Sequence, residues 1–155
     1  IRDPSQAADN ILVHPDVRRM LLTAKVNNEG CRALGVWVGM LLDQLHSDDD
    51  EIRERAEALI ALLTPVVKAH FTDLGCETTS TCMQVMGGAG YCSEYGVEQF
   101  YRDVRISKIW EGTNGIQALD LAGRKITQDL GRNLRYLMWP LVEFIEENRD
   151  IPEMT

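Results

Sequence analysis

The sequence of 155 residues has few histidines and cysteines, the residues on which many protein metal sites depend. Its three histidines are His14, His46 and His70, and none lies in the Glu-x-x-His pairs that a di-iron helical bundle requires. Its four cysteines include no Cys-x-x-Cys pair, so the usual ligand spacing of a zinc site is absent. We therefore expect no bound metal, and we expect the cysteines to be reduced, mostly buried thiols.

Long apolar runs and an excess of basic residues are also missing. No uninterrupted apolar run is long enough to span a bilayer, so we expect no membrane association. The first ten residues, IRDPSQAADN, contain no apolar core and do not resemble a signal peptide. The 16 Lys and Arg residues are outnumbered by 24 Asp and Glu, which gives a formal net charge of -8. This charge would repel duplex DNA or RNA, so we expect no nucleic-acid partner.

Helical periodicity dominates the remaining sequence. In residues 15–45 the apolar positions recur every three or four residues, which predicts one long amphipathic helix. Residues 52–74 show the same pattern and predict a second helix. We expect Ser47 or Asp48 to cap this second helix and Gly75 to end it.

Four shorter helices are predicted after Gly75, and no stretch alternates for long as a surface strand would. A chain of this length fits a single domain. We therefore predict one all-α domain, 1–155, folded as an antiparallel helical bundle. The shorter helices are expected at 77–86, 97–106, 113–126 and 130–145.

The stretch MGGAG, residues 86–90, places three glycines in four positions. One interpretation is a helix end followed by a tight turn, since glycine often ends helices. The other is a close approach of the backbone to a ligand, with backbone N–H groups holding a phosphate. It is not a Rossmann fingerprint, because no predicted strand precedes it. Spacing alone favours the helix end.

The stretch IWEGTNGIQ, residues 109–117, places Glu111 between two large apolar residues and a glycine. The simpler interpretation is an exposed acid near a helix N-terminus, where the helix dipole favours negative charge. The alternative is a general base, which Ile109 and Trp110 would shield from water. In that case Gly112 would let another group approach closely. These residues alone favour the exposed acid.

Taken together, residues 84–126 resemble the C-terminal signature region of acyl-CoA dehydrogenases. The ordered features are a glutamine, a double glycine with Gly-Tyr, an aromatic residue with Arg-Asp, then Glu-Gly-Thr and Ile-Gln. The stretches HPDVRRMLLTAK and GIQALDLAGRK resemble the larger, C-terminally extended branch, which includes the 3-methylmercaptopropionyl-CoA dehydrogenase type. The resemblance implies a four-helix bundle with an extra C-terminal helix. It also implies an N-terminal helical domain and a middle β domain outside these 155 residues.

The resemblance implies FAD-dependent α,β-dehydrogenation of an acyl-CoA thioester to a trans-2-enoyl-CoA, a reaction of fatty acid metabolism. Glu111 matches the glutamate that takes the α-proton in most members. An α-proton of a thioester is weakly acidic, so its base must be positioned and shielded from water. Trp110, where tyrosine is commoner, and Gly112 are expected at the substrate pocket.

The resemblance also assigns residues to the cofactor. Gln84 and Gly88 match residues that contact the adenosine-diphosphate part of FAD, usually the FAD of a neighbouring subunit, and Gly87 lies beside Gly88. Thr113 matches a residue that contacts the cofactor. Gly115 stands where many members have a polar side chain near FAD, so that contact is open here.

The implied partners are an electron-transferring flavoprotein as electron acceptor and further copies of the chain, in a dimer or tetramer. The implied location is the cytoplasm, with the mitochondrial matrix as the alternative. The isolated chain is expected to be inactive and to bind FAD weakly, because the missing domains would supply most contacts. Two other functions stay open, a non-catalytic flavoprotein and a helical oligomerisation module of the same fold. The preferred acyl chain length and branching are not specified by these motifs.

Overall fold

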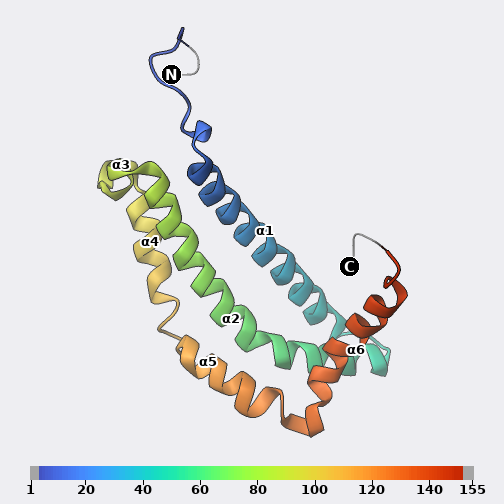
Figure 1. Cartoon of the computed structure of the whole chain (residues 1–155). Helices are drawn as coiled ribbons and strands as arrows, with labels where there is room; N and C mark the ends of the chain where they lie inside the picture. Colours follow the sequence, from blue (N-terminus) through green and yellow to red (C-terminus); the bar gives the residue numbers. More distant parts are fainter. Residues whose placement is uncertain (1–3, 152–155) are drawn as a thin grey trace. The chain divides into compact units, whose positions relative to one another are not determined.

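A computed structural model describes residues 4–151, whose path is shown in Figure 1. The chain forms two compact units: the first contains the chain up to Ala33 together with His70–Glu111. The second contains Leu34–Ala69 and the chain from Gly112 onward. Residues 4–151 form helices, turns and loops without a strand, which confirms the all-α prediction.

Two long antiparallel helices pass through both units. Helix α1 spans Pro15–Gln44 and follows a short 3-10 turn, and α2 spans Asp50–Met86. In the second unit Leu41 of α1 packs against Leu59 and Leu63 of α2, and all three are buried. Full burial of one such side chain contributes about 1.5–3 kcal/mol, so this cluster adds several kcal/mol to the stability of the second unit.

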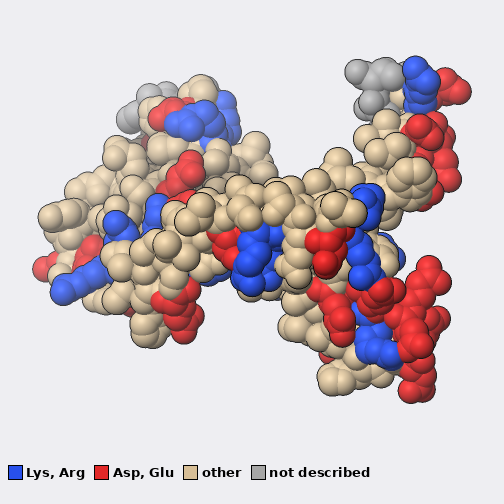
Figure 2. Space-filling model, turned by 90° about the horizontal axis from the view of Figure 1, so that it is seen from below, with Lys and Arg blue, Asp and Glu red and all other residues tan. Residues whose placement is uncertain are grey.

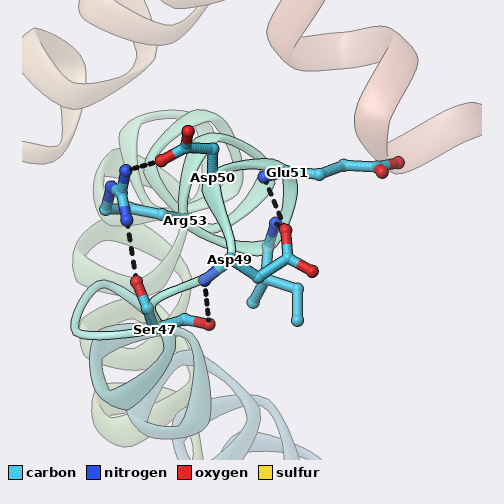
Figure 3. Close-up of polar contacts among 6 residues, drawn as sticks. Ser47, Asp49, Asp50, Glu51 and Arg53 are labelled. Carbon is cyan, nitrogen blue, oxygen red and sulfur yellow. Dashed lines mark hydrogen bonds and ion pairs between the residues drawn. The ribbon is translucent and has the colours of Figure 1, made fainter.

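The turn between α1 and α2 is closed by side-chain oxygens, as Figure 3 shows. The carboxylate of Asp49 accepts hydrogen bonds from the backbone N–H groups of Glu51 and Ile52, at 2.8 and 3.3 Å. Asp49 is therefore the cap of α2, and the prediction of Ser47 or Asp48 was wrong. Ser47 instead orders the turn, because its Oγ accepts from the N–H of Asp49 at 3.2 Å. Serine and aspartate are both common helix N-caps, so the residue types at positions 47 to 49 could not show which of them caps α2.

Helix α2 continues without interruption through Gly75, so the prediction of two helices, 52–74 and 77–86, was wrong. A Cβ atom on Gly75 would lie 2.9 Å from Cγ2 of Val104, in helix α4 (Val97–Ile106). The glycine therefore allows α4 to pack closely on α2 in the first unit. Gly75 therefore leaves room for the Val104 side chain and does not end the helix.

The three glycines of MGGAG have different roles. Gly87 has a φ of 61° and ends α2, which confirms the predicted helix end. A short helix that the sequence did not predict, α3 (Gly88–Tyr91), follows at once. A Cβ on Gly90 would lie 2.7 Å from the carbonyl oxygen of Met83, so Gly90 packs α3 against α2.

The second unit continues with α5, Asn114–Asp120, which passes into a single π-helical segment, Leu121–Lys125. The Oγ1 of Thr113 accepts a hydrogen bond from the N–H of Ile116 at 3.3 Å. Thr113 is therefore the N-cap of α5.

Helix α6 spans Arg132–Glu147 and begins two residues later than predicted. Asp129, Leu130 and Gly131 all have left-handed backbones, with φ of 50°, 55° and 76°. Residues with a left-handed backbone do not fit inside a right-handed helix, so Leu130, the first apolar residue of the predicted helix, belongs to the turn that precedes α6.

Within the described part of the chain, residues 4–151, one helix, α2, is long and apolar enough by length and composition to cross a membrane. Core helices of water-soluble domains pass the same test, so this property is weak evidence for a membrane segment. Two charged side chains of α2, Lys68 and Asp73, bond to other parts of the chain, at Asn114 and Lys108. The expectation of no membrane association stays a prediction.

The chain carries a net charge of -8. On the face drawn in Figure 2, acidic side chains gather most densely at the lower right, while basic side chains lie beside them and elsewhere on this face. Some of these charges form pairs one turn apart on the same helix, such as Asp16 with Arg19 and Asp120 with Arg124. Exposed pairs of this kind contribute little stability and mainly keep the helix surface hydrated.

Candidate functional site

The first unit has a cavity of about 390 Å³ that gathers three of the predicted cofactor residues. They are Gln84, Gly87 and Gly88, at the junction of α2 and α3. None of the residues that line the cavity is charged, so a ligand there would be held by hydrogen bonds and by contact with rings. The other lining residues, which the sequence did not single out, are Ser80, Met83, Tyr91 and Tyr101.

Local geometry explains how this cavity forms. Ser80 and Gln84 are four residues apart in α2, so they lie on one helix face. No atom would lie within 4 Å of a Cβ built on Gly88, which leaves the cavity open there. Tyr91 is 79% exposed and Tyr101 is 38% exposed, so both rings are accessible. The spacing of four residues before Gln84 could have identified Ser80, whereas Tyr101 reaches the cavity only through the packing of α4.

Glu111 lies in the loop that follows α4, in an unusual backbone conformation. The N–H groups of Ile109 and Trp110 both donate to the carbonyl oxygen of Ile106, at 2.9 and 3.2 Å, and close a turn. Glu111 then has a φ of 55° and Gly112 a φ of 85°. A left-handed backbone costs a residue other than glycine about 1–2 kcal/mol. Strain of this kind is concentrated at functional sites, so it marks Glu111 as a candidate.

The side chains around Glu111 do not shield it in this chain. Glu111 is exposed, and so are Ile109 and Trp110, at 54% and 60%. The two apolar residues therefore do not exclude water from the carboxylate in this chain, and shielding of Glu111 in a complete enzyme stays a prediction.

Gly112 is held by a residue of α5. The side-chain Nε2 of Gln117 donates to the carbonyl oxygen of Gly112 at 3.5 Å, a long hydrogen bond. A Cβ on Gly112 would lie 2.7 Å from the same nitrogen. Position 112 favours a glycine mainly because of its positive φ, since the Gln117 amide is the end of a flexible side chain that can move aside.

Side chains on both sides of this loop form polar contacts with α2, one set in each unit. In the first unit Lys108 Nζ lies 2.5 Å from Asp73 Oδ1, and this hydrogen bond, followed by charge attraction, raises the pKa of Lys108. In the second unit Lys68 Nζ donates to Asn114 Oδ1 at 2.8 Å, and Asn114 Nδ2 donates to the carbonyl oxygen of Ala69 at 3.2 Å. Sequence reasoning missed Asn114, whose partners lie more than forty positions away.

The predicted site residues are thus only partly gathered. Glu111 and Trp110 belong to the first unit but do not line its cavity, and Gly112 and Thr113 belong to the second unit. A Cβ on Gly115 would meet only Thr113 Oγ1, at 4.0 Å, so there is space for a side chain there. Within residues 4–151, no group of three or more His, Cys, Asp or Glu side chains could hold a metal ion.

Comparison with known proteins agrees with this helical architecture. Residues 1–126 match the family model described as acyl-CoA dehydrogenase, C-terminal domain. The chain belongs to the acyl-CoA dehydrogenase family and corresponds to its C-terminal helical domain.

The similar relatives include three bacterial enzymes. The chain is 46% identical to a 3-methylmercaptopropionyl-CoA dehydrogenase of Ruegeria pomeroyi over 84% of the chain and 22% of that protein. It is 36% identical to a butyryl-CoA dehydrogenase of Syntrophomonas wolfei over 97% of the chain and 25% of that protein. It is 34% identical to a broad-specificity linear acyl-CoA dehydrogenase of Mycobacterium tuberculosis over 86% of the chain and 22% of that protein. The chain therefore spans about a quarter of the length of these relatives.

Proposed function

We propose that this chain is the part of an FAD-dependent acyl-CoA dehydrogenase that supplies the catalytic base and part of the cofactor site. The reaction removes a proton from Cα and a hydride from Cβ of an acyl-CoA thioester, which leaves a trans-2-enoyl-CoA. Glu111 takes the α-proton on its carboxylate. The flavin, when bound, supplies the acceptor for the β-hydride.

The observation that carries this proposal is the backbone of Glu111. Glu111 and Gly112 are consecutive residues with positive φ, and they lie in the Glu-Gly-Thr stretch that matches the family signature. A conformation that costs free energy persists where the surrounding structure enforces it, and it serves to aim a side chain. A base that must meet one C–H bond of a bound thioester has this requirement.

The cavity at the end of α2 supports the assignment of FAD. Its volume of about 390 Å³ lies within the range of small-ligand sites, and two tyrosines offer faces on which a planar ring can stack. Gln84 supplies an amide that can both donate and accept hydrogen bonds. The open space beside Gly88 lets a ligand approach the backbone closely. Gly87 is assigned to the same cavity. Thr113, which belongs to the second unit, is assigned to the cofactor through the family resemblance alone.

Exposure of the base supports the further expectation that the isolated chain is inactive. Glu111, Ile109 and Trp110 are all open to water in this chain, and a hydrated carboxylate is a weaker base toward a C–H bond. Trp110 and Gly112 border the acyl-CoA substrate once other parts of the enzyme cover them. Purified residues 1–155 should carry no stoichiometric flavin absorbance, and tight flavin on them would contradict this expectation.

The partners and location follow from the family. We assign an electron-transferring flavoprotein as electron acceptor, a homo-oligomer of two or four chains, and the cytoplasm of a bacterium as the location. The relatives in Ruegeria, Syntrophomonas and Mycobacterium, which are bacteria, support the location.

The test is the Glu111→Gln variant of a complete dehydrogenase polypeptide that contains this domain. A general base contributes roughly 10²–10⁴-fold to rate, so turnover of acyl-CoA substrates should fall by at least that factor. FAD content, measured by absorbance, should stay unchanged, because the amide occupies the same volume. Glu29→Gln, which removes an equally exposed acid from α1, is the matched control and should retain activity. Undiminished turnover in the Glu111 variant would refute the assignment of the base.

A further inference from the structure

A second cavity, of about 510 Å³, lies wholly within the second unit and has a different character from the first. It lies between the first turns of α2 and the N-terminal half of α6. Three arginines meet in it, although the chain as a whole carries a net charge of -8. No motif in the sequence and no residue of the proposed dehydrogenase site belongs to it. The lining residues are Glu51, Arg55, Arg132, Arg135, Tyr136, Trp139 and Pro140.

Two of the arginines are held in place by the fold. Arg132 forms an ion pair with Glu54, and its guanidinium lies 5.6 Å from the centre of the Tyr136 ring. Arg135 donates from Nη1 to the carbonyl oxygen of Leu130 at 2.9 Å. An arginine has five N–H donors, so each guanidinium keeps donors for a further acceptor. The Tyr136 ring restricts the orientation of the Arg132 guanidinium, and the carbonyl oxygen of Leu130 restricts that of Arg135.

The third arginine is available to a ligand. Arg55 follows Glu51 by four residues on α2, a spacing at which helix ion pairs often form. Within residues 4–151, however, the Arg55 guanidinium makes no ion pair or hydrogen bond. Figure 3 shows that Glu51 takes part in the cap of α2 only through its backbone N–H, which donates to Asp49, while its side chain extends away from the turn. The cavity therefore offers an unpaired guanidinium together with a separate carboxylate.

Trp139 gives the cavity an exposed aromatic wall. Its indole Nε1 donates to Glu143 Oε1 at 2.6 Å, which fixes the orientation of the ring, and the side chain is 66% exposed. Arginine guanidinium groups bind phosphate oxygens in pairs, and exposed tryptophan or tyrosine faces stack on nucleobases. Glu51 can accept a hydrogen bond from a sugar hydroxyl or from a base amine. The chemistry of the lining matches a ligand with one anionic end and one planar end.

We propose that this cavity binds a phosphorylated nucleoside, with the phosphates at Arg55 and Arg135 and the base against Trp139. Its volume lies within the range of small-ligand sites. An acidic peptide would satisfy the arginines but would leave the tryptophan face without a partner. The ligand is either a free nucleotide or the nucleotide end of a larger cofactor. The site goes beyond the proposed dehydrogenase chemistry, because none of its residues is assigned to that reaction.

The experiment is an NMR titration of ¹⁵N-labelled residues 1–155 with ADP, followed at the indole N–H signals of the three tryptophans. The Trp139 signal should shift with saturation, while Trp37 and Trp110, which lie outside the cavity, serve as internal controls. Adenosine should bind more weakly than ADP, and inorganic phosphate should leave the Trp139 signal in place. FAD and coenzyme A, tested in the same way, distinguish the nucleotide end of a larger cofactor from a free nucleotide. A titration in which ADP does not move the Trp139 signal would overturn the proposal.

Two variants locate the binding event independently. Arg55→Gln should weaken ADP binding by about tenfold or more, since a charge-assisted hydrogen bond is lost. Arg32→Gln removes the same charge from an exposed position on α1 and should leave binding unchanged. Trp139→Leu should abolish the preference for ADP over inorganic phosphate. Because both variants alter exposed side chains, circular dichroism should show an unchanged fold. An ADP affinity of Arg55→Gln equal to that of Arg32→Gln, or stronger competition by a peptide copying residues 46–51, would overturn the site. Neither result bears on the Glu111→Gln test of dehydrogenation.

Discussion

Replacing Gly75 with alanine separates two effects that oppose each other at this position. Inside a helix, alanine is about 1 kcal/mol more favourable than glycine. At Gly75 the new Cβ would lie 2.9 Å from Cγ2 of Val104, a β-branched side chain that has little freedom to move. Overpacking of this kind costs about 1–3 kcal/mol. The net expectation is a change between neutral and about 2 kcal/mol of destabilisation.

The chain contains matched controls for this substitution. Gly30 and Gly39 lie in the interior of α1, and a Cβ on either would meet no atom within 4 Å. Gly30→Ala and Gly39→Ala should therefore each stabilise the chain by about 0.5–1 kcal/mol. Urea unfolding followed by far-ultraviolet circular dichroism measures all three. Adding Val104→Ala to Gly75→Ala should show a favourable coupling, because the truncated side chain no longer meets the new methyl group. If Gly75→Ala stabilises the chain as much as Gly30→Ala does, the close packing of α4 on α2 is refuted.

Three further perturbations test the loop, the cap and a surface pair. Gly112→Ala should lower the free energy of unfolding by about 1–2 kcal/mol, because alanine disfavours the positive φ at this position. Adding Gln117→Ala should not fully restore this stability, since truncating Gln117 gives space but leaves the backbone strained. A Gly112→Ala variant as stable as the parent chain would contradict the left-handed backbone. Thr113→Val should lower the free energy of unfolding by about 1 kcal/mol, because the hydrogen bond that caps α5 is lost, and Thr113→Ser should lower it less. Equal stability of the two variants would show that this cap does not stabilise α5. The hydrogen bond from Arg124 lowers the pKa of Asp120, so the stability from this pair is present above the unfolded pKa and is lost as the pH falls through the folded one. Asp120→Asn should therefore reduce stability at neutral pH and leave acidic stability unchanged, as measured by urea unfolding across pH.

Much of the helical framework follows from local pattern. The predicted span 97–106 coincides with α4, and the long periodic stretch from Pro15 coincides with α1 to within a residue. These succeed because apolar spacing and, in α1, a proline in the first turn act within a few residues. Boundaries failed where several residues could serve, as at the cap of α2, or where the pattern continued through a left-handed turn, as at Leu130.

The candidate site divides in the same way. The order of motifs from residue 84 to 126 was enough to indicate the family, which the comparisons then established. It was also enough to name Glu111 as a base, which stays a prediction. The cavity residues Met83 and Tyr101 and the contacts of Asn114 were not found, because each depends on which helices pack together.

The sequence by itself determined that the chain is helical, where most of its helices lie and which family it belongs to. These properties depend on short-range periodicity and on the order of motifs along the chain. Only the tertiary structure decided that Gly75 makes room for α4 and that the backbone turns left-handed at Glu111. It alone decided that three arginines of an acidic chain share one cavity. The physical reason is that each of these depends on atoms brought together by packing, and their separation in the chain leaves no local signal.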